Sequence, residues 1–169
     1  MTGAIGTPVV VPSGGDNPQG ILTTPDGHFV IVVNQGAGNV SVSSLDPNVG
    51  TLSAVSGSPF ASGNQPGPIT MDPSGKFLFV ADTAGNSLYA YTIDSAGRLT
   101  AVTGTPIALG STAQPSSIAV DPSGKFVYVS IEPKQLAGFA LDPSTGALTP
   151  VTGSPFSAGA VTHDIVFVP

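Results

Sequence analysis

The sequence predicts an all-β fold made of short repeated strands, on the evidence of its composition and its apolar runs. The chain has 169 residues, the size of one ordinary domain, and only 8 % of them are charged, against about 25 % in a typical soluble protein. The 22 Gly and 17 Pro interrupt every stretch in which a long helix could form. Hydrophobic residues make up 40 % and gather in β-branched and aromatic runs, so the chain can bury a core rather than remain disordered.

A repeat of 48 or 49 residues organises the chain. It is anchored on Gly27, Gly75 and Gly124, each of which follows a Pro by two residues and precedes an apolar run such as Phe-Leu-Phe-Val or Phe-Val-Tyr-Val. An internal period of this length is typical of repeat architectures. We divide the chain into three complete repeats, with partial units before and after them. The complete repeats are 18–65, 66–114 and 115–159, and the partial units are 1–17 and 160–169.

Each repeat contains four β-type runs in a fixed order, as its second copy illustrates. The first run begins at Ile69 and ends in Pro-Ser-Gly, a turn in which Pro presets φ and Gly accepts a positive φ. The second, Phe77–Val80, is apolar on both sides and is expected at the centre of a sheet. The third, Leu88–Ile93, ends before an Asp whose carboxylate can cap the next turn. The fourth runs from Leu99 to a Gly-Thr-Pro sequence.

Four antiparallel strands in a unit of this length predict a β-propeller blade. One blade cannot bury both of its faces, so it needs neighbours on either side. We predict three complete blades and one extra strand at each end, at Gly6–Val9 and Ile165–Phe167. Propellers close with about four to eight blades, so this arc is an incomplete ring. Its open faces are expected to drive self-association or to pack against missing blades of the same propeller.

The charge balance and the missing motifs exclude several classes of function. Four basic residues against ten acidic ones give a net charge of −6, which disfavours nucleic acid and anionic lipid. The chain has no Cys, no phosphate-binding loop and no apolar run of the length needed for membrane insertion. One Asp per turn and two distant His residues are too few ligands for calcium or zinc. We therefore expect no metal and no cofactor.

The repeat resembles the lactonase family with a seven-bladed propeller, typified by bacterial 6-phosphogluconolactonase and fungal carboxymuconate cyclase, and related propellers with a Tyr-Val-Thr-Asn repeat. The resemblance rests on the pattern Pro-x-x-Ile-x-x-Asp-Pro-Ser-Gly-Lys-Phe-x-Tyr-Val, an Asp-x-x-x-Gly-x-Leu turn and Val-Thr-Gly-Ser-Pro-Phe, and it covers Gly6 to Pro169. It implies hydrolysis of a lactone, or binding of a sugar-like ligand, on the upper face of the disc. Two identical chains cannot each supply the same number of blades to a seven-bladed ring. We therefore expect this chain to be a fragment or a truncated gene product rather than half of a closed dimer.

Two residues carry the catalytic part of the resemblance. Family members have Gly-Pro-Arg-His at the start of a first strand and Tyr-Val-x-Asn-Glu at the end of a second, and this chain keeps His163 and Glu132 there. It replaces the family's Arg with Thr162 and the Asn with Ile131. The start of strand one and the end of strand two lie on the same face of a blade. We therefore expect Glu132 and His163 to face the same side from adjacent blades, as a pair that could activate water.

Two readings of function stay open from the sequence. In the first the chain is an enzyme of the 6-phosphogluconolactonase type, acting on a small carbohydrate or lactone through Glu132 and His163. In the second it is a non-catalytic propeller scaffold for protein or ligand interaction, or for self-assembly, which the near-identical repeats and the missing Arg favour. Low-charge versions of this repeat rich in Ser, Thr and Gly resemble exported envelope proteins. We therefore expect an extracytoplasmic location, with the cytoplasm as the alternative.

Overall fold

The computed structural model describes residues 11–159 and 164–167, which contain fifteen β-strands and no helix. The strands are β1 (Pro18–Thr23), β2 (Phe29–Asn34), β3 (Asn39–Leu45), β4 (Leu52–Ala54), β5 (Phe60–Ala61), β6 (Pro66–Met71), β7 (Phe77–Asp82), β8 (Ser87–Ile93), β9 (Leu99–Ala101), β10 (Ile107–Ala108), β11 (Pro115–Val120), β12 (Phe126–Ile131), β13 (Gln135–Leu141), β14 (Leu148–Pro150) and β15 (Phe156–Ser157).

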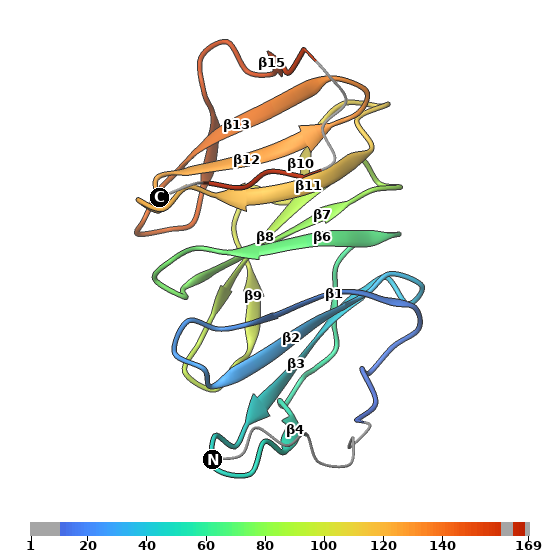
Figure 1. Cartoon of the computed structure of the whole chain (residues 1–169), viewed down its shortest axis with the longest axis vertical. Helices are drawn as coiled ribbons and strands as arrows, with labels where there is room; N and C mark the ends of the chain where they lie inside the picture. The colour runs from blue at the N-terminus through green and yellow to red at the C-terminus, as the bar shows by residue number, and fades with distance from the viewer. Residues whose placement is uncertain (1–10, 160–163, 168–169) are drawn as a thin grey trace, which may run out of the picture.

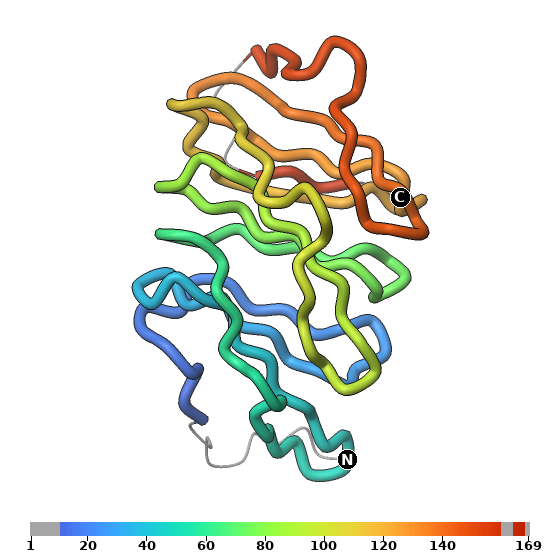
Figure 2. The backbone as a smooth tube through the Cα atoms, turned by 180° about the vertical axis from the view of Figure 1, so that it is seen from behind, coloured from blue at the N-terminus to red at the C-terminus, as the bar shows by residue number. Residues whose placement is uncertain are grey.

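These strands form three antiparallel sheets, one for each sequence repeat, and the all-β propeller arc is confirmed. Blade 1 is β1–β5, blade 2 is β6–β10 and blade 3 is β11–β15. The blades follow one another along the longest axis of the molecule in chain order (Figure 1), and the view from behind shows the same succession (Figure 2). The apolar run of each repeat forms the second strand, which pairs with both neighbours as predicted.

The outer position of each blade differs from the single fourth strand that the sequence predicts. Two short strands, such as β4 and β5, both pair with the third strand, and a turn with a positive-φ Gly separates them. In this turn the hydroxyl oxygen of Ser58 accepts the N–H of Val42 at 2.9 Å, and that of Ser154 accepts the N–H of Gly138 at 2.9 Å. The side chain thus replaces a backbone acceptor of the ladder, so the outer strand is interrupted without leaving these N–H groups unpaired.

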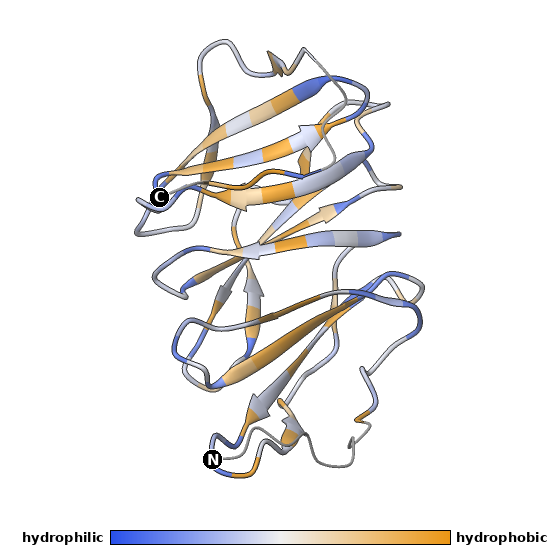
Figure 3. Cartoon of the chain, viewed as in Figure 1, coloured by the Kyte–Doolittle hydropathy of each residue, from blue (hydrophilic) through white to orange (hydrophobic). Residues whose placement is uncertain are grey.

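The hydrophobic core lies between the blades rather than inside one of them. Strand β7 shows this arrangement, because Leu78 and Val80 pack toward blade 1 while Phe77 and Phe79 pack toward blade 3. All six of its residues are buried. Hydropathy follows the same division, with apolar residues concentrated along the strands and polar residues in the turns (Figure 3). Blade 2, which lies between the other two blades, therefore contributes one face of its sheet to each of two separate cores.

One contact recurs at each interface between blades. The turn glycine of a blade, Gly97 or Gly146, lies against the ring of Phe29 or Phe77 of the preceding blade. An added Cβ would come within 2.5 Å of that ring in both cases. At the two ends of the described arc there is no neighbouring blade, so the ring of blade 3 has no turn glycine against it and the turn glycine of blade 1 has no ring against it. Phe126 of blade 3 is 36 % exposed, and Gly50 of blade 1 has nothing within 4 Å of an added Cβ.

Both ends of the arc are crossed by short segments without strand pairing. The carbonyl of Ser13 accepts a hydrogen bond from the side-chain amide of Asn34 in blade 1. At the other end the ring of Phe167 lies 5.9 Å from that of Tyr128 in blade 3. The extra first strand predicted at Ile165–Phe167 does not form, because the N–H of Ile165 donates to the side-chain oxygens of Ser117 and Asp164 and residues 164–167 join no strand ladder. The extra strand predicted at Gly6–Val9 lies outside the described residues.

Candidate functional site: a polar cleft across the inner strands

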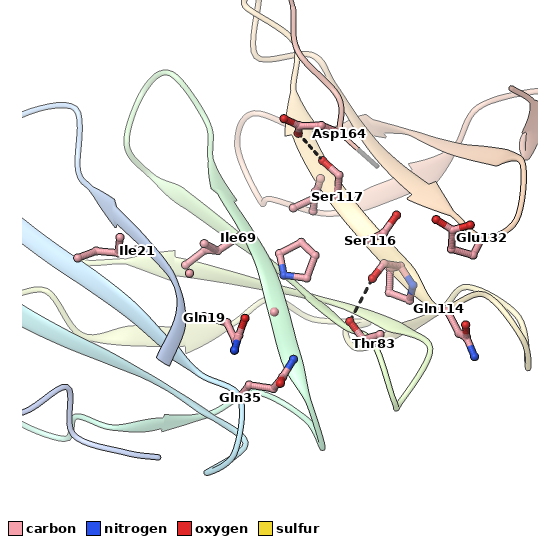
Figure 4. A pocket seen from close by; sticks show the side chains of 15 residues that line it. Gln19, Ile21, Gln35, Ile69, Thr83, Gln114, Ser116, Ser117, Glu132 and Asp164 are labelled. Carbon is pink, nitrogen blue, oxygen red and sulfur yellow. Dashed lines mark hydrogen bonds between the residues drawn. The ribbon is translucent and has the colours of Figure 1, made fainter. Parts of the chain in front are cut away.

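A wide cleft crosses the three blades where their inner strands begin. The inner strands β1, β6 and β11 lie side by side, and the cleft of about 910 Å³ is bounded by their first residues and by the residues that follow β2, β7 and β12. The structure thus brings onto one face the starts of the first strands and the ends of the second strands, as the sequence predicts. The labelled lining side chains are Gln19, Ile21, Gln35, Ile69, Thr83, Gln114, Ser116, Ser117, Glu132 and Asp164 (Figure 4).

Glu132 lies in the wall of this cleft, directly after β12. Its backbone N–H donates to the carbonyl of Ala113 at 3.0 Å. Gln35 and Thr83, which follow β2 and β7, make a similar bond to the residue just before their own first strand, Asn17 at 3.0 Å and Gln65 at 3.1 Å, whereas Ala113 lies two residues before β11. This shared bond fixes one position per blade at the cleft, occupied in turn by an amide, a hydroxyl and a carboxylate. The peptide bond from Glu132 to Pro133 is cis.

His163, the predicted partner of Glu132, lies outside the described residues. The three blade positions equivalent to it are Gln19, Gly67 and Ser116, and all three line the cleft. That His163 faces the cleft, and that it pairs with Glu132, both stay predictions.

Asp164 is a second carboxylate in the cleft, and the sequence analysis did not single it out. One of its oxygens accepts the hydroxyl of Ser117 at 3.1 Å and the backbone N–H of Ile165 at 2.9 Å. The Ser117 bond, drawn dashed in Figure 4, ties the last segment of the chain to β11. The equivalent positions in the three complete repeats are Gly20, Pro68 and Ser117, so the presence of an acidic residue at this position in the last unit alone was the signal that could have identified Asp164.

The cleft differs from the family pattern where Ile131 replaces Asn. Ile131 is only 3 % exposed and belongs to the core between blades 2 and 3. It therefore supplies no polar group beside Glu132. Thr162, which replaces the family's Arg, lies outside the described residues.

A His–Asp pair lies at the opposite end of the strands. His28 Nδ1 is 2.9 Å from Asp26 Oδ2, and both side chains are exposed. Hydrogen bonds from the Thr24 hydroxyl and from His28 hold the pKa of Asp26 well below its usual range. This pair belongs to a turn between β1 and β2, where its contacts are local. Within residues 11–159 and 164–167 no three His, Cys, Asp or Glu side chains are placed to hold a metal ion.

Twisted antiparallel sheets that pack face to face in chain order, with inner strands bordering a common cleft, define a β-propeller. The sequence matches the family described as "Lactonase, 7-bladed beta-propeller" over residues 2–60 and 53–163. The chain belongs to this family.

Solved structures agree with this assignment at the level of fold. A candidate 6-phosphogluconolactonase from Bacteroides uniformis is 20 % identical with a TM-score of 0.79, covering 90 % of this chain and 44 % of that one. A periplasmic gluconolactonase from Pseudomonas aeruginosa is 20 % identical with a TM-score of 0.73, covering 86 % of this chain and 42 % of that one. The chain therefore spans less than half the length of these structures. None of the curated proteins matches the sequence.

Among the residues that the structure describes, no helix is long and apolar enough to cross a membrane.

Proposed function

We propose that this cleft binds a sugar-like lactone and that Glu132 promotes its hydrolysis as a general base. The observation that carries the proposal is the position of Glu132. It is the single Glu of the chain, and it stands in the cleft wall at a blade position where the other two repeats have Gln35 and Thr83. The amides and hydroxyls around it match the hydroxyl groups of a sugar ring in hydrogen-bonding character.

The proposed reaction is addition of water to the lactone carbonyl. The Glu132 carboxylate accepts a proton from a water molecule as the water oxygen forms a bond to the carbonyl carbon. The ring carbon–oxygen bond then breaks, the ring oxygen takes up a proton, and an open-chain hydroxy acid leaves. Because neighbouring hydroxyl and amide groups can donate to the developing oxyanion, Ser116 and Gln114 are the candidate stabilisers in the cleft. His163 is proposed to pair with Glu132 and to stabilise the proton that the carboxylate accepts.

Replacing the carboxylate tests this proposal. The Glu132→Gln variant of the full chain should hydrolyse glucono-1,5-lactone about 100-fold more slowly or worse, because the amide cannot accept the proton. The measurement is the rate of acid release in weakly buffered solution, corrected for spontaneous hydrolysis. Asp16→Asn is the matched control, since Asp16 is an exposed carboxylate that does not line the cleft. Absence of turnover in the unaltered chain, or equal turnover in the Glu132→Gln variant, would refute the catalytic role.

The second candidate function is a non-catalytic propeller that binds a ligand or a partner without hydrolysing it. The burial of Ile131 favours it, because the Asn that accompanies the Glu in the family pattern has no polar counterpart here. Binding of a sugar lactone that is unaffected by Glu132→Gln, together with no acid release above the spontaneous rate, would support this scaffold function and exclude the catalytic one.

A further inference from the structure

We infer that Asn86 is a positioning residue of the cleft, which holds Gln114 in the cleft wall from the neighbouring blade. Asn86 does not itself line the cleft. It stands in the turn between β7 and β8 of blade 2, whereas Gln114 directly precedes β11 of blade 3 and lines the cleft. Its effect on hydrolysis rests on the proposed function, in which Gln114 is a candidate oxyanion stabiliser, but the contact between the two residues does not depend on that function.

The segment that connects blade 2 to blade 3 is anchored on Asn86 at three points. The N–H of Gln114 donates to Asn86 Oδ1 at 2.8 Å. Asn86 Nδ2 donates to the carbonyl of Ser111 at 3.3 Å, and the backbone carbonyl of Asn86 accepts the N–H of Leu109 at 2.9 Å. One residue of blade 2 thus binds both the beginning and the end of the segment 109–114, which lies between β10 and β11.

The connection between blades 1 and 2 is anchored differently. There the carboxylate of Asp82, which is only 1 % exposed, accepts the N–H groups of Asn64 at 2.8 Å and Gln65 at 2.9 Å. Asp82 is the last residue of the second strand of blade 2, and blade 3 has Ile131 at that place, whose side chain accepts no hydrogen bond. The connection to blade 3 is also the longer of the two. It therefore takes its anchor from blade 2 rather than from its own second strand.

Both residues of this contact have backbone conformations that depend on support from their surroundings. Asn86 has φ +49° and Gln114 has φ +40°, in the left-handed region that residues other than glycine rarely adopt. Blade 1 has Gly38, with φ +64°, at the place of Asn86 directly before the third strand, so a glycine satisfies the geometry of this turn. The contribution of the Asn86 side chain therefore lies in its contacts rather than in the turn.

The left-handed Gln114 accompanies a shift of one residue in the cleft wall. In blade 2 the carbonyl of Gln65, directly before β6, accepts the N–H of Thr83 at 3.1 Å. In blade 3 the N–H of Glu132 donates at 3.0 Å to Ala113, one residue further from the first strand. Gln114 thus stands between the bonded residue and β11, at the same end of the cleft as Glu132 (Figure 4). We expect Gln114 to leave this wall when its bond from blade 2 is removed.

Hydrogen exchange at the Gln114 amide tests the contact without any ligand. In the Asn86→Gly variant of the full chain the backbone can still adopt a positive φ, but the side-chain acceptor is lost. The Gln114 N–H should exchange at least about fivefold faster, measured by NMR, while the N–H of Val129, buried in β12, keeps its rate. In Asn86→Asp the carboxylate can still accept this N–H, so the rate should stay within about twofold of that in the unaltered chain.

Lactone hydrolysis measures what the contact does for the proposed reaction. Because an oxyanion donor acts mainly in the transition state, Asn86→Gly should lower kcat for glucono-1,5-lactone about tenfold and change KM less than about twofold. Asn86→Asp should recover most of the lost kcat. Asn48→Gly is the matched control, since Asn48 is an exposed Asn in the turn between β3 and β4 and does not line the cleft. It should change neither kcat nor the exchange rate at Gln114.

The two measurements separate this inference from the catalytic proposal. An unchanged Gln114 exchange rate in Asn86→Gly would overturn the inference. Faster exchange with an unchanged kcat, or equal losses of kcat in Asn86→Gly and Asn86→Asp, would overturn it as well. Absence of hydrolysis by the unaltered chain would refute the proposed function, and the exchange rates of the two variants alone would then decide whether Asn86 holds Gln114 in the cleft wall.

Discussion

The turns between the first and second strands of blades 1 and 2 each use one carboxylate and one hydroxyl as hydrogen-bonding groups, but at exchanged positions. In blade 2 the carboxylate of Asp72 accepts the N–H groups of Lys76 at 2.9 Å and of Phe77 at 2.7 Å. In blade 1 the hydroxyl of Thr24 stands in this place and accepts the N–H of the residue that begins β2 at 3.1 Å. The carboxylate has moved to Asp26, two residues on, where it accepts the N–H of His28. The turn therefore requires the pair of acceptors rather than a fixed sequence.

The Asp side chains in the turns of the blades lead us to predict that the folded chain loses stability in acid. Hydrogen bonds from Ser144 and its neighbours lower the pKa of Asp142, and those from Thr24 and His28 lower that of Asp26. For Asp121, burial opposes ionisation, but hydrogen bonds from Ser123, Phe126 and Lys125 outweigh it and lower the pKa. Because each folded pKa is depressed, the stabilisation is present above the unfolded value of about 3.9 and is lost as pH falls through the folded values.

Urea unfolding at a series of pH values measures this effect. The free energy of unfolding should be nearly constant from about pH 7 to pH 5 and should fall below about pH 4. Asp142→Asn should reduce the steepness of the acid limb, since it removes one of the titrating groups. A free energy of unfolding that stays level to pH 3 would contradict the prediction.

At the scale of the strands, the sequence predicts the central elements well and the outer ones less well. The second strand of each repeat begins with four consecutive apolar or aromatic residues, so its place at the centre of the sheet follows from burial. The division of the outer strand depends instead on Ser58 and Ser154, whose hydroxyls accept N–H groups of the third strand sixteen residues away. A contact between a side chain and the backbone at that separation leaves no periodic signal, so the sequence analysis joined the two short strands into one.

The contact between a turn glycine and an aromatic ring gives a second prediction. Gly146 has φ +77°, and an added Cβ would lie 2.5 Å from the ring of Phe77. Gly50 occupies the same turn in blade 1 with φ +75°, but it meets nothing within 4 Å. Gly50→Ala should therefore cost only backbone strain, about 1 to 2 kcal/mol. Gly146→Ala should cost about 1 to 3 kcal/mol more, because the interface between blades 2 and 3 must also shift.

Chemical denaturation gives the free energy of unfolding of each variant and of the unaltered chain. The extra loss in Gly146→Ala over Gly50→Ala measures the cost of disturbing the interface between the blades. Equal losses in the free energy of unfolding would mean that the ring of Phe77 moves aside without cost, and would contradict a close fit between the blades.

The two ends of the arc are chemically unlike. On the open side of blade 3 the rings of Phe126 and Tyr128 lie 6.4 Å apart, and Phe167 packs against Tyr128. On blade 1 the third strand presents Ser41 and Ser43 at the positions where blade 2 has tyrosines. In blade 2 one of these, Tyr91, is buried, and its hydroxyl donates to the carbonyl of Ala61 in blade 1 at 2.7 Å. Blade 3 therefore exposes the more aromatic face.

We propose that the isolated chain self-associates through this face of blade 3. Sedimentation velocity of the 169-residue chain should show an average mass above that of the monomer, rising with concentration. Phe126→Asp should shift the distribution toward the monomer, because it places a charge on the open face. Val49→Asp is the control, since Val49 is a 70 % exposed apolar residue in a turn of blade 1. A stable monomer at all concentrations would contradict the proposal.

The repeat predicts the number of blades, their order and the face that carries the cleft. These follow from positions that recur in every copy, so a single sequence is enough to place them. The cleft's individual chemistry depends on the departures from the repeat. Glu132 was identified because it is unique, whereas Asp164 was missed because its approach to Ser117 joins residues 47 apart in the chain.

The recurring contact of Phe29 with Gly97 and of Phe77 with Gly146 has a consequence for how such proteins change size. Every repeat contains both residue types of this contact, the phenylalanine at the start of its second strand and the glycine in the turn after its third strand. A duplicated or transplanted repeat would carry its own ring for the blade that follows and its own glycine for the blade that precedes it. Gene duplication could thus lengthen the arc one blade at a time without redesign of any neighbour.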